Sequence, residues 1–158
     1  MTAHAQLRIR VLDEELSEAL RSSIAEDGPE SGLVFVADRT VGSEWHDVSA
    51  ELLTAFELSR LAVMAAAPIV YVVWHADLLG AGGDAGAAMV ATGLLSGARS
   101  AAVEMQKAGV PVNVLAIEDD TPAATTAAWV ARLLALEPGG PAGEVVRLGS
   151  RHLGKTLP

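Results

Sequence analysis

Acidic and histidine side chains follow three apolar runs of this sequence. His75 and Asp77 come directly after one run, Glu118 and Asp119 after the next, and Asp38 after an earlier one. A histidine with nearby carboxylates can bind a metal ion or exchange protons with a substrate. Ligands of parallel α/β proteins gather outside the carboxyl ends of the strands. One hypothesis is therefore an independent small-molecule enzyme or a ligand-binding module that uses His75, Asp77, Glu118 and Asp119.

A structural role for the same residues is the simpler interpretation. Residues 118–120 are acidic and precede a predicted helix, whose N-terminal amides and dipole favour carboxylates. His75 and Asp77 are most simply loop residues. The residue types alone leave both interpretations open.

A glycine-rich segment, 80–86, lies between a predicted strand and a predicted helix, where loops that cradle phosphates occur. Asp84, however, places a carboxylate at the start of the helix, where a phosphate would bind. The next candidate acid, Glu104, lies within a helix rather than at a strand end. The segment is better interpreted as a flexible turn.

Strands and helices that alternate along the chain would position these residues. Short apolar or alternating runs predict strands, and longer runs with helical periodicity predict helices. The predicted strands are 6–12, 32–37, 68–74, 110–117 and 144–148, and the predicted helices are 13–25, 47–66, 84–107 and 121–136. This alternation predicts an α/β fold with a parallel sheet of about five strands and right-handed crossovers. No linker divides the chain, so residues 1–158 are expected to form a single domain.

Charge and composition exclude several classes of function. Asp and Glu number 20 and Lys and Arg 11, so the net charge of -9 opposes binding to nucleic-acid phosphates and anionic membranes. The two uncharged runs, 61–74 and 85–98, are shorter than the roughly 20 residues of a membrane-spanning helix. Without cysteine there is no thiol nucleophile, disulfide or thiolate metal site, and the N-terminus lacks a signal-peptide pattern. We expect a soluble cytoplasmic protein that binds neither nucleic acid nor membranes.

Four segments resemble, in order, parts of the short-chain dehydrogenase/reductase (SDR) family. Residues 56–60 are similar to the family's fourth helix, and residues 98–114, ending in Gly-Val-Pro-Val-Asn-Val, to its fifth helix and sixth strand. Residues 127–134 and 143–146 resemble its last helix and closing strand. The resemblance implies a truncated Rossmann-like three-layer domain that lacks the N-terminal nucleotide-binding half.

The residues that carry out the family's chemistry are missing at the matching positions. The family's tyrosine and lysine fall on Ala87 and Ala91, its serine on Trp74, and its helix asparagine near Glu51. Two methyl side chains can neither transfer a proton nor change the acidity of a phenol. The only tyrosine, Tyr71, lies inside a predicted strand. The resemblance therefore implies a chain that is not catalytic and binds no cofactor on its own.

Two predicted helices, 47–66 and 84–107, carry more apolar surface than one core-facing stripe requires. The first has large apolar residues on more than one side, and the second has small residues that permit close helix approach. In the resembled family the corresponding helices form a four-helix dimer interface. The residues expected to contact a partner are Leu52, Phe56, Leu61, Met64, Met89, Gly93, Gly97 and Ala101.

These features together predict a pseudoenzyme subunit that associates with a full-length catalytic SDR and stabilises or completes it. The resulting heteromeric dehydrogenase/reductase would use NAD(P) bound by the catalytic partner. A homo-oligomer formed through the same helices is an alternative, as is the independent enzyme or binding module at the strand ends.

Overall fold

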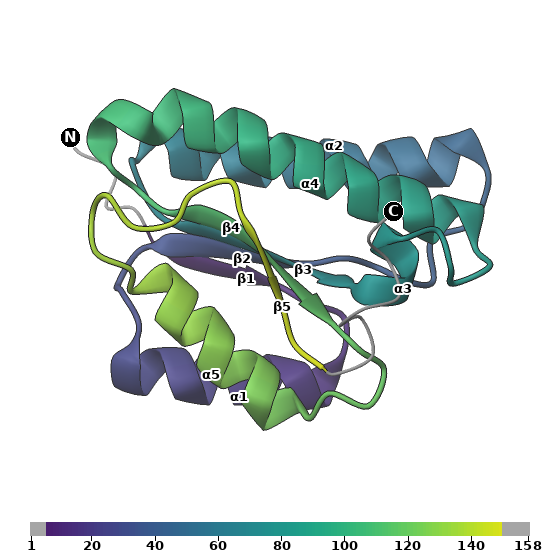
Figure 1. Cartoon of the computed structure of the whole chain (residues 1–158), viewed down its shortest axis with the longest axis horizontal. Coiled ribbons are helices and arrows are strands. Elements are labelled where there is room, and N and C mark those ends of the chain that lie inside the picture. Colours follow the sequence, from purple (N-terminus) through teal and green to yellow (C-terminus); the bar gives the residue numbers. More distant parts are fainter. Residues whose placement is uncertain (1–5, 150–158) are drawn as a thin grey trace.

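In a computed structural model, which describes residues 6–149, five parallel strands form one sheet between two layers of helices (Figure 1). The strands are β1 (Leu7–Arg10), β2 (Gly32–Val36), β3 (Ile69–Trp74), β4 (Val112–Ile117) and β5 (Val145–Arg147). The helices are α1 (Glu14–Asp27), α2 (Trp45–Met64), α3 (His75–Leu78), α4 (Ala85–Met105) and α5 (Ala123–Leu134), with a 3-10 turn η1 (Gln106–Ala108) after α4. The predicted α/β fold with a five-stranded parallel sheet is confirmed.

Burial explains the composition of the strands. Every residue of β2 and β4 is buried, because helices cover both faces of the sheet at these strands. Both strands are accordingly apolar, apart from Asn113 in β4, whose side chain donates to the Pro141 carbonyl and accepts from the Glu144 backbone N–H. In β1 the apolar and charged residues alternate, so that Leu7 and Ile9 pack toward α1 and α5. Among the described strands β1 pairs with β2 alone. It is the edge strand that its alternating pattern predicts.

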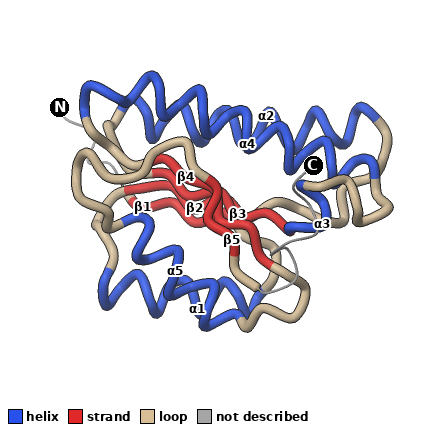
Figure 2. Tube along the Cα trace, viewed as in Figure 1, coloured by secondary structure: helices blue, strands red, loops and turns tan. Residues whose placement is uncertain are grey.

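The helices divide into two layers, one on each face of the sheet. Helices α2 and α4 lie side by side on one face, and α1 and α5 pack against each other on the opposite face (Figure 2). The two apolar cores that result are separated by the sheet, and the middle strands contribute side chains to both. Within residues 6–149, no helix is both long enough and apolar enough to cross a membrane.

The hands of the crossovers differ between the two layers. Each strand pairs with its neighbours in sequence, so all four connections step in the same direction across the sheet. Two crossovers that step in the same direction between parallel strands have opposite hands when their helices lie on opposite faces of the sheet. With β2–α2–β3 and β3–α4–β4 right-handed, as crossovers almost always are, β1–α1–β2 and β4–α5–β5 are left-handed (Figure 1). The prediction of right-handed crossovers is therefore wrong for α1 and α5, which cover the second apolar face of the middle strands.

Candidate functional site

The connections from neighbouring strands diverge at two places along the carboxyl edge of the sheet. Helix α1 leaves β1 toward one face while α2 leaves β2 toward the other, and α4 and α5 diverge in the same way after β3 and β4. Diverging connections open a crevice at the strand ends, which is where α/β proteins bind ligands. The predicted strand-end residues lie at the second of these places.

The last residues of β3 and β4, Trp74 and Ile117, are paired in register. His75 and Asp77 follow Trp74, and Glu118 and Asp119 follow Ile117. The expectation that His75 and Asp77 are loop residues is wrong, because they form the single helical turn α3, where both are buried. The expectation that the acids at 118–120 cap the next helix is also wrong, since α5 begins at Ala123 without a side-chain cap.

Arg39, which the sequence analysis did not select, joins two of the predicted carboxylates. Its Nε donates to Asp77 Oδ2 at 2.9 Å, and its Nη1 donates to Asp119 Oδ1. The guanidinium also lies 5.0 Å from the centre of the Trp74 ring. Burial disfavours the charge of Arg39, but the hydrogen bonds and negative charges of the two aspartates outweigh this effect and raise the pKa of the guanidinium.

The network holds the buried Asp77 carboxylate against the Arg39 guanidinium. Asp77 is 3% exposed, and both of its carboxylate oxygens accept hydrogen bonds from Arg39, at 2.9 and 3.4 Å. This carboxylate is therefore paired with a cation inside the protein, and both of its oxygens are already hydrogen-bonded. In residues 6–149 no group of three or more His, Asp or Glu side chains is placed to hold a metal ion.

A second arginine joins the two strands at the other crevice. Arg10 donates from both terminal nitrogens to the two carboxylate oxygens of Glu51, each at 2.6 Å, and donates to the Val36 carbonyl at 2.8 Å. The backbone N–H of Asp38 donates to the same carboxylate at 3.0 Å. Glu51, at the position that resembles the family's helix asparagine, therefore ties β1, β2 and α2 together.

The start of α1 is occupied by acidic side chains. Asp13 caps the helix by accepting a hydrogen bond from the Leu16 backbone N–H at 2.7 Å, and Glu14 and Glu15 lie in the first turn. In dinucleotide-binding folds the helix N-terminus after the first strand holds the pyrophosphate, through free amides and glycines that permit close approach. The residues present here do not fit such a group, because a carboxylate already uses the amide and three negative charges repel phosphate.

The glycine-rich segment before α4 has a similar arrangement. Asp84 caps α4 by accepting a hydrogen bond from the Ala87 backbone N–H at 2.9 Å.

The positions that resemble the family's catalytic tyrosine and lysine are buried, since Ala87 is 6% exposed and Ala91 is 1% exposed. The Ala91 methyl group packs in the core between the sheet and the α2 and α4 layer, and Ala87 is buried in the first turn of α4.

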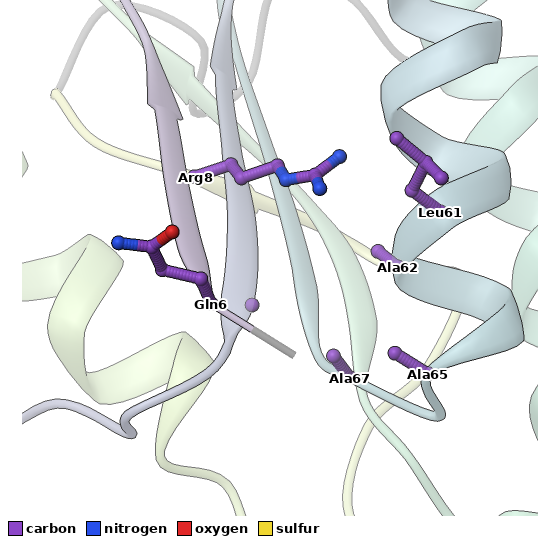
Figure 3. A pocket seen from close by; sticks show the side chains of 7 residues that line it. Gln6, Arg8, Leu61, Ala62, Ala65 and Ala67 are labelled. Atoms are coloured by element: carbon purple, nitrogen blue, oxygen red, sulfur yellow. The ribbon is translucent and has the colours of Figure 1, made fainter. Parts of the chain in front are cut away.

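Large apolar side chains are exposed on the outer surface of α2 and α4. Those on α2 and α4 together, with their exposed fractions, are Trp45 67%, Leu53 56%, Phe56 63%, Leu61 42%, Met64 71%, Met89 46% and Val103 74%. Phe56, Leu61, Met64 and Met89 are among the contact residues predicted from the sequence, whereas Trp45, Leu53 and Val103 are not. Leu61 lies apart, on the side of α2 that faces β1, where it lines a small cavity with Arg8 (Figure 3).

A groove of about 730 Å³ runs between α2 and α4. Leu52, Gly93, Gly97 and Ala101, all predicted contact residues, line it. A Cβ atom at Gly93 would lie 2.7 Å from the Leu52 side chain, so the helices meet there, whereas a Cβ at Gly97 would have no neighbour within 4 Å. The groove therefore opens beside Gly97.

Tyr71 lies at the floor of this groove and is 2% exposed. Its hydroxyl lies 2.6 Å from the Ser59 hydroxyl, which donates to the Ala55 carbonyl at 2.6 Å. Burial raises the pKa of the Tyr71 phenol, and the hydrogen bond with Ser59 opposes this only in part. The phenol is therefore a neutral group, on the face of β3 that packs against α2 and α4.

The fold, with its parallel sheet and two helical layers, is that of a Rossmann-like three-layer domain. No protein-family model matches the sequence, and no curated protein sequence matches it significantly. Among solved structures, an enoyl-acyl-carrier-protein reductase from Plasmodium berghei, crystallised with triclosan, is similar with a TM-score of 0.61 and 13% identity. The similarity covers 84% of this chain and 62% of the reductase.

The citronellol catabolism dehydrogenase AtuB of Pseudomonas aeruginosa is similar with a TM-score of 0.55 and 21% identity, over 87% of this chain and 68% of the dehydrogenase. At these identities the similarity shows the fold alone. The chain shares the Rossmann-like fold of these two proteins, and it spans less than two thirds of the length of the enoyl reductase.

Proposed function

We propose that the chain is a non-catalytic SDR-like subunit that associates through α2 and α4 with a full-length catalytic SDR. In the cytoplasmic complex that we envisage, this chain stabilises or completes the partner. The partner would bind NAD(P) and carry out the dehydrogenase or reductase reaction. The observation that carries the proposal is the exposed apolar surface of the two helices.

The size and position of this surface support a protein partner. Leu53, Phe56 and Met64 on α2, and Met89 and Val103 on α4, are each 46% exposed or more. Monomeric proteins rarely expose several large apolar side chains on one pair of adjacent helices, because burying such a surface against a partner is favourable. In the resembled family the matching helices form a four-helix interface.

The chemistry of the remaining candidate positions supports a non-catalytic role. Ala87 and Ala91 have no group that transfers protons, and acidic residues occupy the start of α1, where a pyrophosphate would bind. The proton of the Tyr71 phenol is directed to Ser59, because the single proton of Ser59 is donated to the Ala55 carbonyl. We therefore assign neither cofactor binding nor proton transfer to this chain.

The test is co-expression with an intact reductase encoded beside this chain in its genome, followed by size-exclusion chromatography with light scattering. We expect a stable complex that Phe56→Glu disrupts, because the new charge would lose its hydration in the interface. Leu12→Glu is the matched control, since Leu12 is 66% exposed but belongs to the connection between β1 and α1 and not to α2 or α4. A monodisperse monomer that forms no complex would contradict the proposal, and a homodimer sensitive to Phe56→Glu would favour the homo-oligomer.

An independent enzyme using His75, Asp77, Glu118 and Asp119 is the alternative. It has less support, because Arg39 already binds two of these carboxylates. Under this alternative, replacing His75 and Glu118 would abolish an activity of the isolated chain while the association with a partner persists.

A further inference from the structure

The groove between α2 and α4 has the dimensions of a small-molecule site. Its volume of about 730 Å³ lies within the range of roughly 300–1,000 Å³ that is typical of ligand pockets. Its walls are mostly apolar, and the polar pair of Tyr71 and Ser59 lies at its floor.

The hydrogen bonds at the floor have a fixed direction. The Ala55 carbonyl can only accept, so the Ser59 hydroxyl must donate its one proton there, at 2.6 Å. Ser59 therefore accepts from Tyr71 across their 2.6 Å contact, and the phenol proton is used as well. Both oxygens keep lone pairs but have no proton left to donate.

From this polarity we infer that the groove binds a neutral, largely apolar small molecule that carries one hydroxyl or N–H group. That group would donate to the Tyr71 or Ser59 oxygen, while the apolar body would pack against Leu52, Phe56 and Val63. A carbonyl or carboxylate would face lone pairs at the same place and be repelled. The charged residues of the lining, Arg60 and Glu104, are exposed at the rim and leave the floor neutral. This site is separate from the strand-end residues and does not depend on a protein partner.

The test uses 1-naphthol and 1-naphthaldehyde, two neutral probes of similar size, of which only the first has a donor. Titration calorimetry on the isolated full chain should show 1-naphthol binding roughly tenfold more tightly, the effect of one net hydrogen bond. Ser59→Ala leaves the Tyr71 proton without an acceptor, so the preference should shrink or reverse toward 1-naphthaldehyde. Failure of the isolated chain to bind either probe, or an unchanged preference in Ser59→Ala, would overturn the inference.

A second variant tests the position of the site independently of Ser59. Gly97→Leu should abolish binding of both probes, because its side chain would enter the groove at a place with no neighbour within 4 Å of the new Cβ. Ser96→Leu adds the same side chain one residue earlier, at an exposed position that does not line the groove, and should leave binding unchanged. Binding that persists in Gly97→Leu would also overturn the inference. This result is independent of whether the chain forms a complex with a reductase on co-expression.

Discussion

Replacing Glu51 by alanine tests whether the ion pair with Arg10 holds the edge strand on the sheet. The substitution removes two hydrogen bonds to the Arg10 guanidinium, of 2.6 Å each, and one from the Asp38 backbone N–H, of 3.0 Å. Both side chains are largely buried, with exposed fractions of 20% for Arg10 and 5% for Glu51. The remaining guanidinium would therefore lose its counter-charge without becoming fully hydrated.

Removing one member of a buried ion pair costs about 3–5 kcal/mol of folding free energy. Arg10 keeps its hydrogen bond to the Val36 carbonyl and its position 4.7 Å from the centre of the Phe35 ring. We therefore expect the low end for Glu51→Ala, about 3 kcal/mol, equivalent to a fall in Tm of roughly 6–12 °C for a domain of this size. Glu51→Gln keeps the shape and one acceptor oxygen for Asp38 and Arg10 Nη1, but it loses the charge and the acceptor for Arg10 Nη2, so about 2 kcal/mol is expected.

Urea unfolding followed by circular dichroism measures both losses. Glu57→Gln is the matched control, because Glu57 is exposed on the same helix and should change the unfolding free energy by less than about 0.5 kcal/mol. If Glu51→Ala unfolds within about 0.5 kcal/mol of the parent chain, the ion pair does not stabilise the edge strand and the reasoning is refuted.

Further substitutions test three other contacts. Arg39→Met leaves the buried Asp77 carboxylate without its cation and should lower the unfolding free energy by about 2–3 kcal/mol, whereas Asp119→Asn, at a side chain 73% exposed, should change it little. Above about pH 10 the unfolded chain loses the Tyr71 proton before the folded chain does, because burial raises the pKa of the folded phenol, so stability falls as pH rises. Tyr71→Phe should flatten that fall, and equal pH slopes in the two proteins would contradict it. Asp13→Ala removes the cap of α1 and should cost about 1 kcal/mol, with an unchanged urea midpoint as the contrary result.

The apolar pattern of the sequence predicts the sheet well, because strands buried on both faces leave a continuous apolar run. The five predicted strands match β1 to β5 within a few residues. The predicted helix 47–66 is shifted by two residues, since α2 begins at Trp45 and ends at Met64. Helix ends depend on capping contacts and on backbone angles, such as the φ of 48° at Ala66 just after α2. The apolar periodicity of a sequence gives no information on either.

The placement of the candidate site depends on contacts between distant segments. Arg39 and Asp119 are 80 residues apart, and Arg10 and Glu51 are 41 apart, so neither ion pair has a local signature. Arg10 belongs to the alternating apolar and charged pattern of β1, which predicts a half-exposed strand and does not reveal the buried partner Glu51. The groove beside Gly97 was likewise invisible in the sequence, where small residues indicate only that two helices can approach.

The pairing of α1 with α5 has a consequence for the order of folding. These helices come from opposite ends of the described chain, whereas β2, α2, β3, α4 and β4 form one continuous stretch whose strands pair with their neighbours in sequence. Contacts between distant segments form late, because the intervening chain must first be ordered. During synthesis the α2 and α4 layer can assemble as soon as β4 has emerged, while α1 waits for α5. The apolar faces of β2 and β3 beneath α1 and α5 thus stay uncovered longest, and that interval is when the nascent chain is most prone to aggregate.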